Sequence, residues 1–262
     1  MKLKRVIGVL KQEYFITIRS VEVMVDVLFF PLVNIVVFGF LSLYLSGGTH
    51  ALAGEYVLLG MLLWQIIWII EYSVTLGSLW NIWSRNLSNM FIAPLEFKEY
   101  ILAHSVSGIV KAVMLLGLGG ILSHFVFGFD LLSIGLLPLA LVFINFSFFA
   151  FSVGITVLGL LFRYGTRIQA LSWSLITIFQ PLSAAFFPLY VLPAPIQLVS
   201  KLFPSTYTFE AARYALVNHA VEWNYFGIAF VENIFYFILS IIFFAYMFKV
   251  SRDTGQFVRN EA

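Results

Sequence analysis

The sequence of 262 residues contains no cysteine. This absence excludes disulfide bonds, a thiolate nucleophile and a thiolate metal site. The histidines lack any metal-binding spacing such as H-E-x-x-H, and the four are scattered: His50, His104, His124 and His219. We therefore expect no metal site. No order of Ser, His and acidic residues indicates a catalytic site, so we do not expect an enzyme.

Charge is also scarce. Only 11% of the residues are charged, whereas 61% are hydrophobic. A soluble domain would carry about a quarter charged residues, so lipid surrounds most of this chain. A phosphate-binding loop is missing as well, because the sequence has no G-x-x-x-x-G-K-[ST] motif and no Gly-Lys pair at all. The chain therefore cannot bind ATP through a phosphate-binding loop.

Long apolar runs take the place of the missing charge. A spanning helix needs about 20 mostly apolar residues, and runs that are continuous rather than alternating favour helices over strands. Six such runs occur, at residues 23–46, 55–79, 100–127, 132–162, 168–187 and 225–248. The sequence thus predicts an all-α polytopic membrane protein with six transmembrane helices, forming a single domain over residues 1–262.

Lysine and arginine are absent from two short connections, residues 47–54 and 128–132. Twelve of the fifteen basic residues lie instead in segments 1–22, 80–99 and 163–167 and in the tail after residue 248. The positive-inside rule makes that side cytoplasmic. We therefore expect a multi-pass protein of the cell (inner, cytoplasmic) membrane, with both termini in the cytoplasm.

Residues 1–22 alternate apolar and polar side chains with a helical period. Apolar residues recur at i, i+3 or i+4 and i+7, while Arg5, Gln12 and Arg19 fall on another face. This pattern predicts an amphipathic helix in the membrane interface, near anionic headgroups. A cytoplasmic helix packed on a partner is the alternative. The segment lacks a continuous apolar core and a small-residue cleavage site, so it does not read as a signal peptide.

Residues 188–216 follow the fifth candidate span on the predicted outer side. The segment is mostly apolar, yet it contains Pro188, Pro193, Pro195 and Pro204. Proline interrupts helices, and broken backbone at membrane depth is tolerated only inside protein or beside a water-filled cavity. We expect a re-entrant helical hairpin; an ordinary amphipathic loop lying on the membrane is the alternative.

Two charged residues interrupt the apolar runs. Glu71 lies past the middle of the second candidate span, and Lys111 lies at a similar depth in the third. An unpaired charge at this depth costs several kcal/mol, so such residues pair or line a wet cavity. We predict an intramembrane Glu71–Lys111 pair that joins the two spans. The alternative is that one of them contacts a substrate or carries protons.

Two groups of motifs resemble those of ABC-2 type permeases, the membrane subunits of ATP-binding cassette exporters. The outer segment contains Phe187–Pro188, Leu192–Pro193, Pro204, Thr206, Tyr207, Phe209, Glu210 and Arg213 in the order found in that family. The 80–101 connection contains Arg85, Leu87, Phe91–Ile92, Pro94–Leu95 and Glu99. It departs from the family at residues 86–88, where Asn-Leu-Ser replaces the frequent acidic residue and Gly-Thr.

The resemblance implies a separate ABC ATPase subunit, which would bind ATP and Mg²⁺, while this chain would hold no cofactor. It also implies a homodimer in membrane lipid, with the substrate path between the two permeases and no nucleic acid partner. A coupling helix over residues 84–93 would transmit closure of the ATPase, through Arg85, Asn86, Asn89, Met90, Phe91 and the terminating Pro94. A solvated turn is the alternative for this link.

The same resemblance assigns residues 188–216 to an outer gate of the path. Its candidate residues are Pro188, Tyr190, Pro193, Pro204, Tyr207, Glu210 and Arg213. Glu210 and Arg213 are three residues apart, so they can pair on one helix face; contacts with a partner subunit or a substrate are the alternatives.

The function implied is export of a hydrophobic, lipid or lipid-linked substrate, in a multidrug, lipid or polysaccharide branch of the family. The runner-up is an ion-coupled secondary transporter or channel that acts without an ATPase and uses Glu71 and Lys111. Internal repeat symmetry, which secondary transporters often show, is not visible in the sequence.

Overall fold

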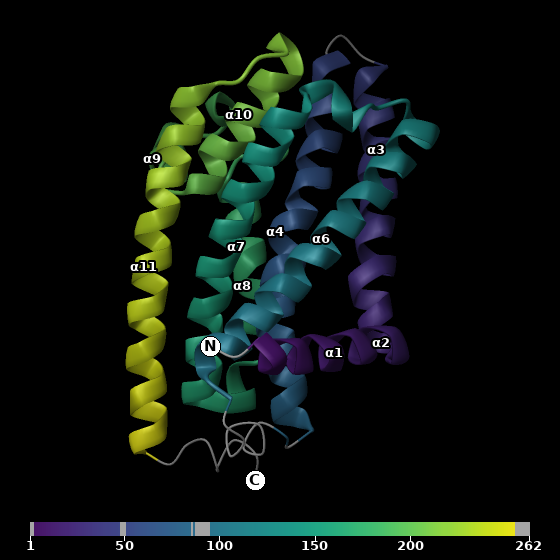
Figure 1. Ribbon diagram of the computed structural model, residues 1–262. Coiled ribbons are helices and arrows are strands. Elements are labelled where there is room, and N and C mark those ends of the chain that lie inside the picture. Colours follow the sequence, from purple (N-terminus) through teal and green to yellow (C-terminus); the bar gives the residue numbers. More distant parts are fainter. Residues whose placement is uncertain (1–2, 48–50, 85, 87–94, 255–262) are drawn as a thin grey trace.

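The computed structural model describes residues 3–47, 51–84, 86 and 95–254 (Figure 1). Within these ranges every regular element is a helix, and no strand occurs. The all-helical prediction is therefore confirmed. In chain order the elements are α1 (Leu3–Arg19), α2 (Val21–Met24), η1 (Val25–Phe29), α3 (Phe30–Ser46), α4 (Ala51–Trp83), α6 (Phe97–Phe127), η2 (Leu131–Ile134), α7 (Leu136–Tyr164), η3 (Gly165–Ile168), α8 (Leu171–Leu182), η4 (Leu189–Val191), α9 (Ala194–Ser200), α10 (Pro204–Asn218) and α11 (Trp223–Asp253).

Five helical stretches are long and apolar enough to cross a membrane. They are Val21–Ser46, Leu52–Trp83, Phe97–Phe127, Leu136–Ile168 and Trp223–Asp253, and they correspond to the predicted first four spans and the sixth. The predicted fifth span contains α8, an apolar helix of 12 residues. This helix is shorter than the roughly 20 residues that a crossing requires. The chain is thus a multi-pass membrane protein with five candidate spanning helices among its described residues.

Local sequence sets several helix boundaries. At the start of α6, the Glu96 and Glu99 side chains each accept a hydrogen bond from the other residue's backbone N–H, which forms a capping box. The helix ends at Gly128, whose φ of 68° is in the left-handed region that glycine adopts without penalty. Pro31 has no amide hydrogen to donate, and the chain forms the π turn Val25–Phe29 shortly before it.

The helices are arranged as a bundle with two distinct ends (Figure 1). α1 and α2 lie across one end, which we call the α1 end and at which α6 starts and α4, α7 and α11 finish. α9 and α10 lie at the opposite end, which we call the α10 end. The described parts of the basic segments 1–22, 80–99 and 163–167 and of the tail therefore lie at the α1 end.

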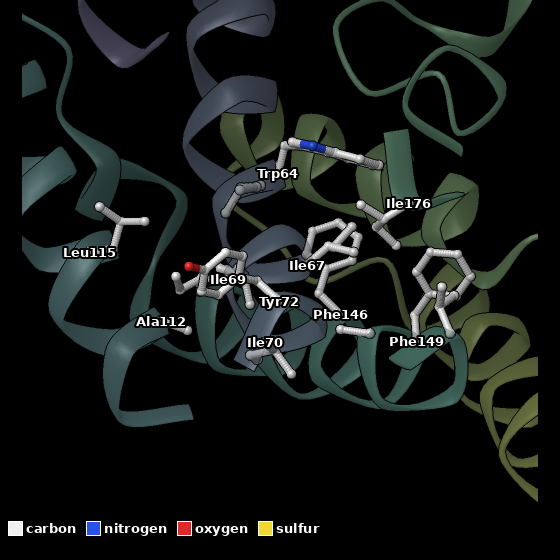
Figure 2. Packing of buried hydrophobic residues seen from close by; sticks show 14 of the residues in the cluster. Trp64, Ile67, Ile69, Ile70, Tyr72, Ala112, Leu115, Phe146, Phe149 and Ile176 are labelled. Atoms are coloured by element: carbon white, nitrogen blue, oxygen red, sulfur yellow. The ribbon is translucent and has the colours of Figure 1, made fainter. Parts of the chain in front are cut away.

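α4 forms the centre of the bundle. In its most apolar 18-residue window, 94% of the residues are buried, compared with 22% in α11. Figure 2 shows Ile67 and Ile70 of this helix between Ala112 of α6 on one side and Phe149 and Ile176 on the other. Helices α6, α7 and α8 thus cover α4, so a helix of membrane-spanning composition here contacts protein rather than lipid.

α7 and α11 lie side by side and share a polar contact inside the bundle. The Asn233 side-chain amide of α11 donates to the backbone carbonyl and to the side-chain oxygen of Asn145 in α7, at 3.0 Å each. Asparagine side chains often join membrane helices in this way. The contact fixes the relative depth of these two helices.

Candidate functional site

A small polar pocket lies between α3, α4 and α8. Its volume is about 120 Å³. Four of its lining residues carry uncharged hydrogen-bonding side chains, and the others are aromatic or apolar. The lining consists of Asn34, Gln65, Thr177 and Gln180 together with Phe30, Pro31, Met61, Trp64 and Trp68.

Asn34 and Gln65 lie near the middle of their candidate spans, and Thr177 lies near the middle of α8. Asn34 and Thr177 are exposed on the surface of the chain. Gln65 is only 3% exposed, and its Nε2 has no hydrogen-bond partner among the described residues. Polar groups facing lipid at this depth are costly. This face, which we call the α3–α4–α8 face, is therefore suited to water, a bound molecule or a second protein rather than to lipid.

Two larger cavities are almost wholly apolar. One of about 860 Å³ lies toward the α10 end, between α3, α4 and residues 186–191. The other, of about 340 Å³, lies between α7, α8 and α11 and is lined by aromatic side chains that include Phe149, Phe179 and Phe243. Cavities of this size and character accommodate hydrophobic molecules.

Glu210 and Arg213 pair with each other on α10. The Arg213 guanidinium donates to Glu210 Oε1 at 2.8 Å and to the backbone carbonyl of Ala185 at 3.3 Å. Glu210 Oε1 also accepts a hydrogen bond from the backbone N–H of Leu189 at 2.7 Å. Arg213 is 4% exposed. The pair therefore fixes the irregular segment after α8 to α10, which is a structural use of the two predicted gate residues.

The predicted gate prolines lie at helix starts rather than inside helices. Pro188 precedes η4, Pro193 precedes α9, and Pro204 is the first residue of α10. A proline costs little at such positions, because the first amides of a helix have no intrahelical partner. Tyr190 is 78% exposed, and the Tyr207 ring lies 6.3 Å from that of Tyr225 in α11.

The segment between α8 and η4 approaches α4 closely. The Ser183 and Ser205 hydroxyls are 2.6 Å apart, which joins the end of α8 to the start of α10. A side chain at Gly60 of α4 would collide with the backbone carbonyl of Ala185. Glycine is therefore required at this contact. The segment between α8 and η4 is thus packed onto α4 by its own backbone and not only by side chains.

The structure corrects the partner predicted for Lys111. Its Nζ lies 3.6 Å from Glu13 Oε2, not against Glu71. Glu71 is completely buried, and neither carboxylate oxygen has a hydrogen-bond partner among the described residues. Thr75, one turn further along α4, donates to the carbonyl of Ser172 in α8 at 3.2 Å. Glu71 therefore lies on the α8 side of α4, whereas Lys111 approaches from α6.

Glu13 is the charged residue that the sequence reading missed. It lies on α1 and is 4% exposed, with His104 Nδ1 at 3.5 Å and Lys111 Nζ at 3.6 Å. Burial by itself raises the pKa of the Glu13 carboxyl, but attraction to His104 and Lys111 outweighs burial and lowers the pKa below its usual value. Glu13 is therefore ionised. The sequence signal that could have identified Glu13 is that this carboxylate interrupts the otherwise amphipathic pattern of residues 1–22.

The proposed coupling link lies mostly outside the described residues. Arg85, Asn89, Met90, Phe91 and Pro94 are among the residues not described. Asn86 is described, and its backbone N–H donates to the carbonyl of Asn81 at 2.9 Å. The structure does define the two ends of the link, which are the last turn of α4 and the capping box of α6. Within the described ranges, no group of three or more His, Asp or Glu could hold a metal ion.

Comparison with protein families gives one match. Residues 5–217 match the family described as ABC-2 type transporter. The matched segment extends from α1 through most of α10, and it includes the α3–α4–α8 face, the link and the hairpin region. No curated protein matches the chain.

Proposed function

The chain belongs to the ABC-2 type transporter family, and from this premise we propose that it is the membrane permease of an ATP-driven exporter whose ATPase is a separate subunit. The sequence has no phosphate-binding loop, so ATP and Mg²⁺ would be bound by that partner. Two copies of the chain would assemble with two ATPase copies, and the substrate path would run between the permeases.

The observation that carries this proposal is the α3–α4–α8 face. Exposed Asn34 and the unpartnered Gln65 amide lie near the middle of two candidate spans, and exposed Thr177 lies beside them on α8. The Thr177 hydroxyl already donates to the backbone carbonyl of Ser174 at 2.6 Å. In a homodimer this face of each copy would border a shared path, where water or substrate would supply hydrogen bonds to Asn34 and Gln65. A monomer surrounded by lipid would leave these groups in hydrocarbon.

The substrate in this proposal is hydrophobic, a lipid or a lipid-linked molecule. The apolar cavities of about 340 and 860 Å³ suit acyl chains or aromatic groups. The amide groups of the small pocket suit an uncharged hydrogen-bonding portion of the same substrate. These features are compatible with drug, lipid and polysaccharide branches of the family alike.

We further propose six crossings, of which α8 forms the fifth together with the re-entrant segment that follows it. Residues 188–216 would then act as the outer gate, and both termini would lie in the cytoplasm, on the basic side of the cell membrane. The burial of Pro204 and Arg213 at the α10 end supports a hairpin held within the protein. The apolar exposed residues of α1, such as Ile7 and Tyr14, support its interfacial location.

The coupling role of the 84–93 link remains part of the proposal. Arg85, Asn86, Asn89, Met90 and Phe91 would contact the ATPase, and Pro94 would end the helix. Support comes from the family resemblance and from the two helices that border the link, because the end of α4 and the start of α6 both lie at the α1 end.

Single cysteines test the proposed path directly, because the chain has no native cysteine. We expect Asn34→Cys or Thr177→Cys to form a disulfide between two copies in membranes, whereas Ile242→Cys on the exposed face of α11 should not. A confirmed dimer that crosslinks only at Ile242→Cys would contradict the proposed path.

Gln65→Leu tests the same face through transport. The substitution removes a buried amide without a protein partner, so we expect folded yield to be kept while export into inverted vesicles falls at least about tenfold, the effect of losing one well-placed hydrogen bond to a substrate. Asn224→Leu at the exposed start of α11 is the matched control. Unchanged export in Gln65→Leu would contradict the role of the pocket.

The second candidate function is an ion-coupled transporter that acts without an ATPase, and Glu71 is the residue that tests it. A buried carboxyl without a charged partner is a common feature of ion-coupled carriers. Under that alternative, a proton gradient alone would drive transport by the parent chain, and Glu71→Gln would abolish that transport. Under the ABC exporter proposal, transport by Glu71→Gln would continue and would require ATP.

A further inference from the structure

α1 contacts the bundle through a mixed face rather than through its apolar stripe. Its buried residues are Val6, Val9 and Glu13. Ile7 and Tyr14, two other apolar side chains of α1, are 41% and 60% exposed. A carboxylate is therefore at the centre of the contact between α1 and α6.

The Glu13 carboxylate contacts two bases at once. Oε1 lies 3.5 Å from His104 Nδ1, and Oε2 lies 3.6 Å from Lys111 Nζ. His104 and Lys111 are seven residues apart on α6, so they project from one face of that helix. Each carboxylate oxygen thus has its own basic partner.

The site is buried from every side. Glu13, His104 and Lys111 are 4%, 1% and 7% exposed. Ion pairs in such surroundings are sensitive to the loss of one partner, because the remaining charge is left without water or a countercharge. Lys111 therefore depends on α1 being in place, and α1 is held by a charge in the membrane-spanning part of α6.

α4 leaves room for this cluster at a single glycine. A side chain at Gly77 would collide with the His104 ring, and its Cβ would lie 3.2 Å from Glu13 Oε1. The absence of a side chain there lets the three helices α1, α4 and α6 meet at one point.

Two further polar contacts connect α1 to the helix ends that border the link. The Gln12 amide donates to Asn81 Oδ1 near the end of α4 at 2.7 Å. Arg5 lies 3.5 Å from Glu99 Oε2 in the first turn of α6. α1 therefore bridges the end of α4 and the start of α6, one on each side of the link.

We propose that Glu13 is the positioning residue that keeps α1, the end of α4 and the start of α6 together as one rigid unit. The Glu13–His104–Lys111 cluster determines whether α1 stays docked. The consequence for transport rests on the proposed function, because the link between these helix ends is the segment expected to meet the ATPase.

Docking can be measured in the full chain without any ATPase. Val9 is 5% exposed, so a Val9→Cys reporter should react slowly with a maleimide in mild detergent. We expect Glu13→Gln and Lys111→Met each to speed labelling at least about tenfold, since each leaves a buried charge without its partner. Tyr14→Cys, already exposed, should label at the same rate in all backgrounds.

The double variant Glu13→Gln, Lys111→Met separates ionic docking from general damage and remains informative if a single variant fails to fold. Removing both charges leaves no unpaired ion, so we expect labelling of Val9→Cys no faster than in Glu13→Gln alone. Labelling as slow as in the parent chain in both single variants would overturn the proposal. So would a double variant in which the two effects multiply.

Transport tests the positioning role. With the ATPase still co-purifying, Glu13→Gln should reduce transport at least about fivefold, whereas Lys11→Gln on the exposed side of α1 should not. Faster labelling with unchanged transport would overturn the positioning role. If no ATPase co-purifies at all, the proposed function fails, but the labelling result still decides whether Glu13 docks α1.

Discussion

The two ends of the bundle each contain a glutamate paired with a base, but the pairs are of different kinds. At the α10 end, Glu210 and Arg213 are three residues apart on one helix and 2.8 Å apart in space. At the α1 end, Glu13 and Lys111 come from α1 and α6 and are 3.6 Å apart. The first pair follows from helix geometry alone, whereas the second exists only because the fold brings two helices together.

The difference extends to what each pair does. Glu210 and Arg213 hold the irregular segment between α8 and η4 through Leu189 and Ala185. Glu13 and Lys111 hold a whole helix against the bundle. Breaking the first pair should loosen only the segment between α8 and η4, whereas breaking the second should release α1. The losses of stability in the two cases can therefore be compared directly.

Lys111→Met is expected to have the largest effect on stability. It leaves the buried Glu13 carboxylate with His104 as its remaining basic neighbour, and loss of one partner from a buried pair costs about 3 kcal/mol or more. The measurement is the unfolding temperature of the purified chain in detergent. An unfolding temperature within error of the parent chain would show that the α1-end pair contributes no stability.

Arg213→Met should have the next largest effect, about 2 kcal/mol, because Glu210 is partly exposed and water compensates for part of the loss. The loss should appear in the same unfolding assay and as faster proteolysis between residues 183 and 193. Tyr190→Ala, at a highly exposed position, is the control. Equal stability of Arg213→Met and Tyr190→Ala would mean that the local pair does not hold the segment.

Gly77→Ala should cost about 1–2 kcal/mol, since the added methyl group overpacks the site of Glu13 and His104. Gly117→Ala in α6 is the matched control, because nothing lies within 4 Å of the added carbon. That control should gain up to about 1 kcal/mol from helix propensity. The same shift in both variants would contradict the close packing at Gly77.

Glu71→Gln should have the smallest effect, within about 1 kcal/mol, because no charged partner is lost and a neutral amide is easier to bury than a carboxylate. The comparison with Lys111→Met is decisive in the unfolding assay. If the two residues were partners after all, both substitutions would cost similar amounts.

Composition and local pattern predicted much of this fold. Long apolar runs gave the helices and five of the spans, and the i, i+3 spacing of Glu210 and Arg213 indicated their pairing. The prolines of residues 188–204 predicted interruptions of the helical backbone, and short helices separated by irregular backbone occupy this segment. Each of these features depends on residues that are close in the sequence.

Features that depend on distant residues were not predictable in the same way. Equal depth suggested Glu71 as the partner of Lys111, but depth does not say which side of α4 a residue occupies. α4 and α11 have similar apolar composition, yet 94% of one apolar window and 22% of the other are buried. Only the tertiary arrangement distinguishes protein contact from lipid contact. The predicted fifth run, residues 168–187, extends beyond α8 because its apolar residues continue into irregular backbone after Leu182.

The measurement that tests the central claim most directly is a pull-down of the tagged chain from its native membranes in mild detergent, followed by mass spectrometry. We predict a stoichiometric ATP-binding cassette subunit together with two copies of this chain. Repeated isolation of the chain without an ATPase under gentle conditions would contradict the account and favour an ion-coupled transporter, with Glu71 as the first residue to test.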